Sequence, residues 1–254
     1  MTANPFDLTG KVALVTGSTM GIGEGISRVL ARAGAHVVIS SRKAEDCERV
    51  AAEFAKEGLS AEGRVCHIGK MEDIESMAAH LKDKHGGLDI LVNNAVLSPW
   101  RSIDDTDPAL FMKAMEVNMR GVWFLSVEAT KLMKPRGGGS IVNISSVAAL
   151  HPDKMLGLYS TFKTAMIGMS RSFALEYGEF GIRVNTIMPG LIETKLAKAF
   201  EGPEMARILD GTPLRRIGQP EEIGYAVLYL SAASGGFITG AGLVIDGGAS
   251  IASH

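Results

Sequence analysis

The sequence predicts an α/β fold in which helices cover both faces of a doubly wound, seven-stranded parallel sheet. Short runs rich in β-branched residues alternate with longer amphipathic stretches, and this alternation is typical of strand–helix–strand units. The strand runs are apolar throughout, which indicates burial on both faces. No Pro/Ser-rich linker, low-complexity tract or repeat divides the 254 residues. We therefore expect a single domain over residues 1–254.

Seven runs have the composition of strands, and helical patterns lie between them. The first helix is expected over Glu24–Ala33, directly after a glycine-rich turn. The strand runs are Val12–Val15, Val37–Ser40, Val65–Ile68, Ile90–Val92, Ile141–Ile144, Val184–Met188 and Leu243–Ile245.

The segment from Glu193 to Gly218 interrupts this alternation. It has helical composition around Leu196–Phe200 and Met205–Leu209, with a glycine and prolines between and after these stretches. Ligands of open α/β sheets bind beyond the carboxyl ends of the strands. An insertion that leaves the sixth strand at that edge would therefore act as a helical lid over about 193–218. A plain surface excursion is the alternative.

The turn after the first strand has the glycine spacing of a dinucleotide-binding site. It reads Thr16-Gly17-Ser18-Thr19-Met20-Gly21-Ile22-Gly23. Gly17 would permit the sharp turn, Gly21 would let backbone amides approach a pyrophosphate, and Gly23 would let the helix pack closely on the strand. The helix N-terminus would then face the anion. A purely structural turn is the alternative, but the strand before it and the helix after it favour a Rossmann-type cofactor site.

The end of the second strand indicates which dinucleotide would bind. An NAD site usually has an acidic residue there, on the adenosine ribose. The chain has Ser41, Arg42 and Lys43 instead. The guanidinium of Arg42 suits a 2′-phosphate, and Ser41 offers a hydroxyl. The pattern favours NADP, unless Arg42 and Lys43 are simply solvated charges at the start of a helix.

Further motifs lie at the ends of later strands and in later helices. They are Asn93-Asn94-Ala95, Val117-Asn118, Ser146, Tyr159-Ser160-Thr161-Phe162-Lys163 and Pro189-Gly190. In this order and spacing, and together with the glycine turn, they resemble the short-chain dehydrogenase/reductase family over nearly the whole chain. The stretches 41–43, 67–70 and 94–100 are most similar to its NADP-dependent carbonyl reductase and retinol dehydrogenase branch.

The spacing of Tyr159 and Lys163 has a chemical reason. Residues four apart lie on one face of a helix, so Lys163 can stand beside Tyr159. A free phenol has a pKa of about 10. The ammonium of Lys163, helped by oxidised nicotinamide, would lower the pKa of Tyr159 and let it donate or accept a proton. An ordinary half-buried helix pair is the structural alternative.

The resemblance implies roles for the other catalytic candidates. Ser146 would hold the substrate oxygen, and the family spacing to the tyrosine selects it over the adjacent Ser145. Asn118 would support a water-linked proton relay to Lys163, which would also hydrogen-bond the nicotinamide ribose. The cofactor carries the hydride. Taken singly, Ser146 could instead be a strand-end cap and Asn118 a structural hydrogen-bonding residue.

The resemblance and the glycine turn together predict two sets of binding residues. The cofactor residues are Gly17, Ser18, Met20, Gly21, Ile22, Gly23, Ser41, Arg42, Lys43, His67, Asn94, Ala95, Tyr159, Lys163, Pro189, Gly190, Ile192 and Thr194. The substrate-pocket residues are Val96, Trp100, Val147, Ala149, His151, Met155 and Leu191. Because most of the pocket residues are apolar, we expect a ketone or secondary alcohol with a hydrophobic body.

Three positions depart from the family pattern. Val96 stands where the family usually has glycine, and His67 replaces an aspartate commonly found near the adenine. NADP-preferring relatives often have a basic residue where this chain has Met20. NAD therefore stays open as the alternative cofactor.

Composition excludes several other classes of protein. The net charge is −2 and no long run of like charge occurs, which argues against nucleic acid as a partner. No apolar run reaches membrane-spanning length, and Met1–Leu8 lacks a signal-peptide pattern, so we expect a cytoplasmic protein. Cys47 and Cys66 are expected to be reduced thiols. No metal site is expected, since His67, His80 and His85 lack a ligand-like arrangement with carboxylates or thiols.

Two other functions stay open. A reductase of 3-oxoacyl groups on an acyl carrier protein would share fold, cofactor and catalytic residues, but would need a basic docking surface. Lys131, Lys134 and Arg136 are the candidates for one. A non-catalytic nucleotide-sensing scaffold would not need the intact Ser146 and Tyr159. The resemblance also implies a homotetramer built through long helices, including the one that carries Tyr159.

Overall fold

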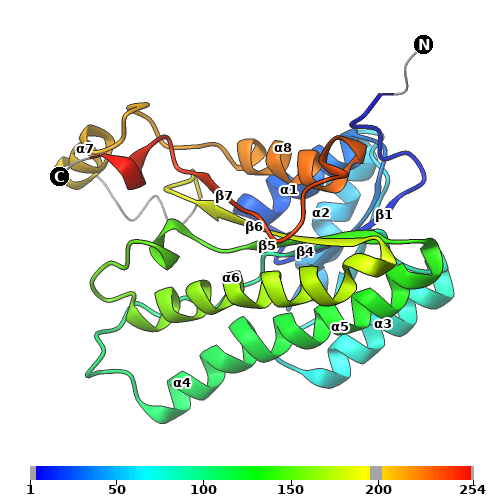
Figure 1. Ribbon diagram of the computed structural model, residues 1–254, viewed down its shortest axis with the longest axis horizontal. Helices are drawn as coiled ribbons and strands as arrows, with labels where there is room; N and C mark the ends of the chain where they lie inside the picture. Colours follow the sequence, from blue (N-terminus) through cyan, green and yellow to red (C-terminus); the bar gives the residue numbers. More distant parts are fainter. Residues whose placement is uncertain (1–3, 195–201, 253–254) are drawn as a thin grey trace.

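The computed structural model describes residues 4–194 and 202–252 of the chain. Seven parallel strands form one sheet in the order β3-β2-β1-β4-β5-β6-β7, which confirms the predicted α/β class. Figure 1 shows this sheet between two layers of helices. Their bounds are β1 (Val12–Thr16), β2 (His36–Ser41), β3 (Ala61–Val65), β4 (Ile90–Asn93), β5 (Gly139–Ile144), β6 (Ile182–Pro189) and β7 (Gly242–Ile245). The strand order reverses between β1 and β4, where open α/β sheets bind their ligands.

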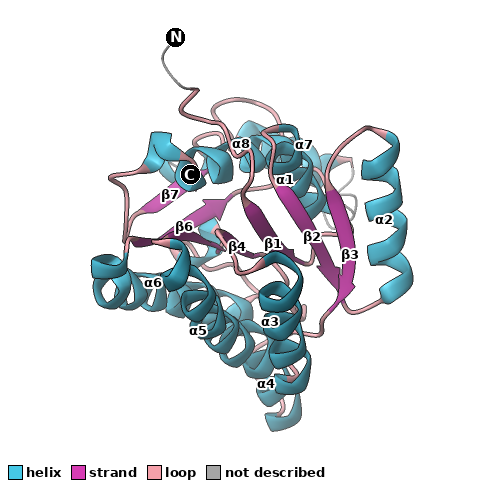
Figure 2. Ribbon diagram, turned by 90° about the vertical axis from the view of Figure 1, so that its right-hand side faces the viewer, coloured by secondary structure: helices cyan, strands magenta, loops and turns pink. Residues whose placement is uncertain are grey.

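Helices cover both faces of the sheet (Figure 2). Neighbouring residues of one strand enter different cores: Val15 packs with α1, α2 and α8, whereas Leu14 packs with α3, α5 and α6. This explains why the strand runs are apolar at every position. The helices are α1 (Gly21–Arg32), α2 (Ala44–Lys56), α3 (Met71–His85), α4 (Pro108–Met115), α5 (Val122–Met133), α6 (Gly157–Tyr177), α7 (Pro203–Asp210) and α8 (Pro220–Ser231).

The third strand differs from the prediction. It spans Ala61–Val65 and not Val65–Ile68. β3 is the edge strand of the described sheet and pairs with β2 alone. An edge strand is more exposed to solvent than a central one and therefore tolerates polar residues. The apolar Cys66 and Ile68 belong to the loop that follows, where they are buried beneath α3 and α5. The apolar run over residues 65–68 therefore indicated a buried loop and not a strand.

The expectation for the histidines of α3 was also wrong. His80 Nε2 and His85 Nε2 lie 2.7 Å and 2.8 Å from Oε1 of Glu62. Assigning the third strand to 65–68 left Glu62 outside it. Its true place near the start of β3 brings its carboxylate over the C-terminal end of α3.

The segment after β6 contains a helix, as predicted, since Met205–Leu209 lies within α7. The other expected stretch, Leu196–Phe200, lies outside the described residues. The base of the segment is closed by backbone pairing: Glu193 donates to the carbonyl of Gly218 at 2.8 Å, and Gly218 donates to the carbonyl of Leu191 at 3.0 Å. Its action as a lid stays a prediction.

Candidate active site

A cleft of about 380 Å³ opens at the carboxyl edge of the sheet, beside the reversal of strand order between β1 and β4. Its size suits a small-molecule ligand. Six segments and α4 supply its walls. The lining residues are Gly17, Thr19, Met20, Gly21, Ile22, Gly23, Ser41, Arg42, Cys66, His67, Ile68, Asn94, Ala95, Val96, Leu97, Lys113, Val117 and Thr194.

The glycine turn on the wall of the cleft is held in shape by close backbone contacts. Gly17 and Gly21 have φ of +63° and +56°, values that residues other than glycine rarely adopt. A Cβ at Gly23 would lie 2.3 Å from the carbonyl oxygen of Gly17. Asn94 fixes the turn from β4, because its Nδ2 donates to the carbonyls of Thr16 and Gly17 at 3.0 Å each.

The amides at the start of α1 are available to an anion. The helix begins at Gly21, and within the described part of the chain no side chain caps it. The first backbone N–H groups of a helix have no partner inside the helix, and together with the helix dipole they form an anion site. The turn therefore fits the pyrophosphate of a dinucleotide.

Ser18 has a structural role in this turn. Its buried hydroxyl donates to the carbonyl of Val15 at 2.7 Å and accepts from the amide of Ser40 at 2.8 Å. These bonds join the glycine turn to β2. The side chain predicted to contact the cofactor is therefore turned into the protein.

Ser41, Arg42 and His67, which were predicted to lie at the adenosine end of the cofactor, all line the cleft. Arg42 is exposed, and Lys43 lies one residue further on as the N-cap of α2. The Nδ1 of His67 accepts from the amide of Gly69 at 3.1 Å, so a neutral His67 carries its proton on Nε2.

The two adjacent serines after β5 have different partners. Ser145 is buried, and its hydroxyl donates to the carbonyl of Lys163 at 2.8 Å. Ser146 hydrogen-bonds the phenol of Tyr159 and accepts from the amide of Ala148 at 3.1 Å. The structure thus pairs the tyrosine with Ser146, the serine that the spacing selected.

Tyr159 and Lys163 lie one turn apart in α6, with Lys163 Nζ 5.6 Å from the centre of the Tyr159 ring. Lys163 is buried and donates to the carbonyl of Ile144 at 2.6 Å. Burial lowers the pKa of Lys163 to about 7. Among the described residues no carboxylate pairs with it.

The pKa of Tyr159 differs from the sequence-based expectation. Burial raises it, and the hydrogen bond with Ser146 acts in the opposite direction. Tyr159 is therefore a protonated phenol at neutral pH in the chain alone. The expected decrease in the pKa of Tyr159 relied on two positive charges, one on oxidised nicotinamide and one on Lys163. Burial lowers the pKa of Lys163, so its side chain is charged in a smaller fraction of molecules at neutral pH.

Asn118 lies in a π-helical turn, η1 (Glu116–Gly121), that joins α4 to α5. Its buried amide group bonds the backbone of Leu97 twice: Oδ1 accepts from the amide at 2.9 Å and Nδ2 donates to the carbonyl at 2.8 Å. Asn118 thereby fastens the loop after β4, which forms one wall of the cleft. π-Helical turns occur frequently at functional sites.

The structure separates the predicted substrate residues into groups. Val96 lines the cleft, and Val147 and Ala149 form a short 3₁₀ turn directly after Ser146. The loops that carry Trp100 and Met155 meet where Arg101 donates to the carbonyl of Met155 at 3.0 Å. His151 is exposed on that second loop.

The residues predicted after β6 do not all reach the cleft. Thr194 lines it and packs against the turn, where a Cβ at Gly21 would lie 3.1 Å from Thr194 Cγ2. Pro189 ends β6, and Gly190 bonds the backbone of β7. Leu191 and Ile192 instead line a separate small cavity of about 80 Å³.

Sequence reasoning missed several residues of the site, among them Thr16 and Lys113. Thr16 Oγ1 accepts from the amides of Asn94 and Ala95 at 3.0 Å and 3.1 Å, and so joins the glycine turn to the loop after β4. Lys113 of α4 is a cation in the cleft wall. It precedes Val117, another lining residue, by four positions, and this helical spacing could have indicated it.

Comparison with known proteins fits this geometry. The family model described as "Enoyl-(Acyl carrier protein) reductase" matches residues 17–250. "Dehydrogenase/reductase SDR family member 4" of Bos taurus is 44% identical over 248 residues, which cover 96% of this chain and 88% of the relative. The chain belongs to the short-chain dehydrogenase/reductase family. The Homo sapiens protein of the same description is 39% identical, over 95% of this chain and 88% of the relative.

Solved structures of short-chain dehydrogenases/reductases superpose closely on this chain. A gluconate 5-dehydrogenase from Burkholderia cenocepacia, in complex with NADP and tartrate, has a TM-score of 0.93 and 31% identity, with 98% of each chain covered. A 7α-hydroxysteroid dehydrogenase, complexed with NADH and 7-oxo glycochenodeoxycholic acid, has a TM-score of 0.93 and 34% identity, with 98% of this chain and 97% of the other covered. The protein is thus an oxidoreductase of a family that binds nicotinamide cofactors.

Within the part of the chain that the structure describes, no helix combines the length and the apolar character needed to cross a bilayer.

Proposed function

We propose that the protein transfers a hydride between NADP(H) and a carbonyl or secondary alcohol whose body is hydrophobic. One observation carries the proposal: the hydrogen-bonded pair of Ser146 and Tyr159 lies next to buried Lys163. Ser146 follows β5 at the edge of the sheet where the cleft opens. This arrangement supplies a proton donor at that edge of the sheet.

The residues present fit a nicotinamide dinucleotide. The uncapped start of α1 would hold the pyrophosphate, and Arg42 with Ser41 would hold a 2′-phosphate. When bound, the cofactor supplies or accepts the hydride. Because one solved neighbour holds NADP and another NADH, the preference for NADP depends on Arg42.

Tyr159 would supply the proton. In reduction, its phenol donates a proton to the substrate oxygen, which Ser146 holds through its hydroxyl. In oxidation, the phenolate of Tyr159 accepts the proton. Since burial raises the pKa of Tyr159, the proton donor needed for reduction is present at neutral pH in the chain alone.

The substrate would meet an apolar wall. Val96 is 47% exposed and Trp100 is 50% exposed, and both lie in the loop that Asn118 fastens. Such apolar surface favours a hydrophobic ketone body. The steroid ketone bound by the 7α-hydroxysteroid dehydrogenase belongs to that class of substrate.

A substrate panel tests the proposal. NADPH and NADH oxidation would be measured with aromatic ketones, bulky aliphatic ketones, sugar acids and 3-oxoacyl thioesters. We expect the highest kcat/KM with NADPH and a hydrophobic ketone. Tyr159→Phe should lower kcat by about a hundredfold or more while cofactor binding, followed by fluorescence titration, persists. Retained turnover in this variant would contradict the assignment.

A reductase of acyl-carrier substrates is the second candidate, because the matching family model carries that description. The predicted docking cations, however, have internal partners. Arg136 bonds buried Asp89 at 2.8 Å, Lys131 pairs with Glu128 at 2.6 Å, and Lys134 lies 3.8 Å from the centre of the Phe180 ring. These contacts weaken the case for a basic docking surface, and the thioester arm of the panel decides between the two candidates.

A further inference from the structure

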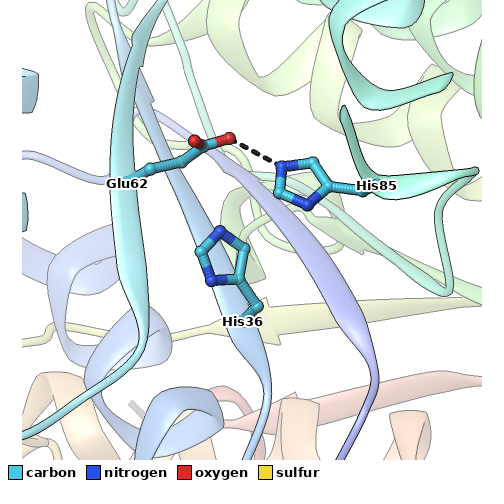
Figure 3. Close-up of side chains that lie close together, drawn as sticks. All are labelled: His36, Glu62 and His85. Atoms are coloured by element: carbon cyan, nitrogen blue, oxygen red, sulfur yellow. Dashed lines mark hydrogen bonds and ion pairs between the residues drawn. The ribbon is translucent and has the colours of Figure 1, made fainter. Parts of the chain in front are cut away.

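A cluster of histidines and one carboxylate lies at the amino edge of the sheet, opposite the cleft. His36 is the first residue of β2, Glu62 is the second of β3, and His85 is the last of α3. Glu62 lies beside Val38, and His36 is two residues before Val38, so His36 and Glu62 point to the same face of the sheet. Figure 3 shows the three side chains converging from these elements.

The three side chains offer a compact set of metal ligands. One nitrogen of each imidazole and one oxygen of Glu62 all lie within 4.8 Å of one another. Glu62 Oε1 already accepts from His85 Nε2 at 2.8 Å and from His80 Nε2 at 2.7 Å. The side chains of Glu62 and His85 are only 14% and 11% exposed. The side chains of Glu62 and His85 are thus largely shielded from solvent.

His36 provides a second, independent observation. Its Nδ1 is hydrogen-bonded to the hydroxyl of Ser60 at 2.8 Å, whereas its Nε2 is buried without a hydrogen-bond partner among the described residues. A buried polar atom without a partner is costly. One ring nitrogen held by a second residue and the other left for an ion is the usual arrangement of a metal-binding histidine.

We propose that His36, Glu62 and His85 bind a divalent transition-metal ion, with zinc as the expected ion. Imidazole nitrogens with one carboxylate suit Zn²⁺, whereas Mg²⁺ and Ca²⁺ require mostly oxygen ligands. Tetrahedral zinc would draw the ligand atoms together to about 3.4 Å. His80, which contacts the same carboxylate oxygen, stands next to the site as a candidate fourth ligand.

The bound ion would connect three elements at this edge of the sheet. It would join β2, β3 and the C-terminal end of α3, and so stabilise the fold far from the catalytic residues. Lys84 opposes it, because its ammonium is bonded to the other oxygen of Glu62. That side chain is 56% exposed and can move into water when an ion binds.

The test uses the full chain after removal of metals by EDTA. Isothermal titration with Zn²⁺ should show one ion bound per chain, and the Tm should rise by several degrees. Co²⁺ as a spectroscopic substitute should give the intense absorption of a tetrahedral site. His36→Gln and Glu62→Gln should weaken Zn²⁺ binding by about tenfold or more. Lys84→Gln should strengthen it, since a competing cation is removed.

A matched control separates the cluster from general binding to surface carboxylates. Glu53→Gln changes an exposed carboxylate on α2 and should leave Zn²⁺ affinity unchanged. Binding undiminished in both cluster variants, or weakened equally by Glu53→Gln, would overturn the proposal. A weak, octahedral Co²⁺ spectrum of the unsubstituted chain would do so as well, and that measurement does not depend on a variant that folds.

Discussion

At the scale of single residues, Lys163 is a buried ionisable group that has no carboxylate beside it among the residues the structure describes. Its pKa falls from 10.5 in the unfolded chain to about 7 in the folded one. Between these values the unfolded state binds more protons, so this group makes stability rise with pH. The cost of its burial is present in full below about pH 7 and fades as the pH approaches 10.5.

Lys163→Met should therefore alter the pH dependence of stability. The variant keeps the length of the side chain without the charge. Relative to the unsubstituted chain, it should gain more in free energy of unfolding at pH 6 than at pH 9, while hydride transfer is lost. Urea unfolding at the two pH values measures this difference. An equal difference at both values would show that Lys163 is not desolvated in the folded chain.

Arg42 should determine the choice of cofactor. Arg42→Asp replaces a cation beside the expected 2′-phosphate by an anion that can accept from a ribose hydroxyl. The ratio of kcat/KM for NADPH to that for NADH should fall by about tenfold or more. Lys43→Asp makes the same change of charge one residue further, at the N-cap of α2, and should have a smaller effect. The reverse order of effects would assign the 2′-phosphate to Lys43.

The residues of the site were predictable to different degrees. Ser146, Tyr159 and Lys163 could be identified because their spacing along the chain is itself part of the chemistry. Thr16 could not, because it acts across two strands, and Lys113 had only its helical spacing to Val117 to indicate it. The pKa of Tyr159 depended on burial, which no local pattern gives.

At the scale of elements, the π-helical turn η1 packs directly on the loop after β3. A Cβ at Gly121 would lie 1.9 Å from the carbonyl oxygen of Ile68, a backbone atom with little freedom to move. This contact explains why a glycine stands at the junction of η1 and α5. The loop of His67 and Ile68 lines the cleft, so the fit of η1 also shapes the binding site.

Gly121→Ala should therefore be strongly destabilising. We expect a loss of about 2 kcal/mol or more, from overpacking against the backbone. Gly178→Ala is the control, because it has helical φ and ψ of −59° and −36° and no atom within 4 Å of the added Cβ. It should be neutral or stabilising by up to about 1 kcal/mol. Calorimetry would compare the two, and similar effects would rule out the contact with Ile68.

The positions of the strands could be predicted from sequence where the buried apolar residues are also the residues of the strand. β1, β4 and β5 lie inside the sheet, and their apolar runs predicted them within a residue or two. β3 lies at an edge, so polar residues occupy the strand and apolar ones the loop after it. Because the third strand was predicted over residues 65–68, the contact of Glu62 with the histidines of α3 was not predicted either.

At the scale of the whole molecule, α4 and α5 expose large apolar side chains. Phe111, Met112, Trp123 and Phe124 are 41% to 48% exposed. Several large apolar side chains exposed on two consecutive helices are typical of an interaction site. We infer that copies of the chain associate through these helices, in keeping with the homotetramer that the family resemblance implies.

Sedimentation velocity should show a tetramer at micromolar concentration. Phe124→Arg should reduce the mass to that of a dimer or a monomer, because an arginine in an apolar contact leaves a charge unpaired. The far-ultraviolet circular dichroism should stay unchanged. A monomeric mass for the unsubstituted chain would contradict the inference.

The general architecture was the most predictable property of the chain. Strand–helix alternation, together with strand runs that are apolar at every position, was enough to indicate a doubly wound sheet with two cores. The closure of the segment after β6 was not predictable, because it depends on Glu193 meeting Gly218 through backbone bonds that carry no side-chain signature.

That closure has a consequence for engineering and for divergence between relatives. Because Leu191 and Gly218 are already paired at the base, the residues between them can vary in length or sequence without opening the sheet beneath. The segment can therefore be exchanged as a cassette. Grafting the corresponding stretch of a relative between these two anchor points offers a route to new substrate selectivity on an unchanged catalytic frame.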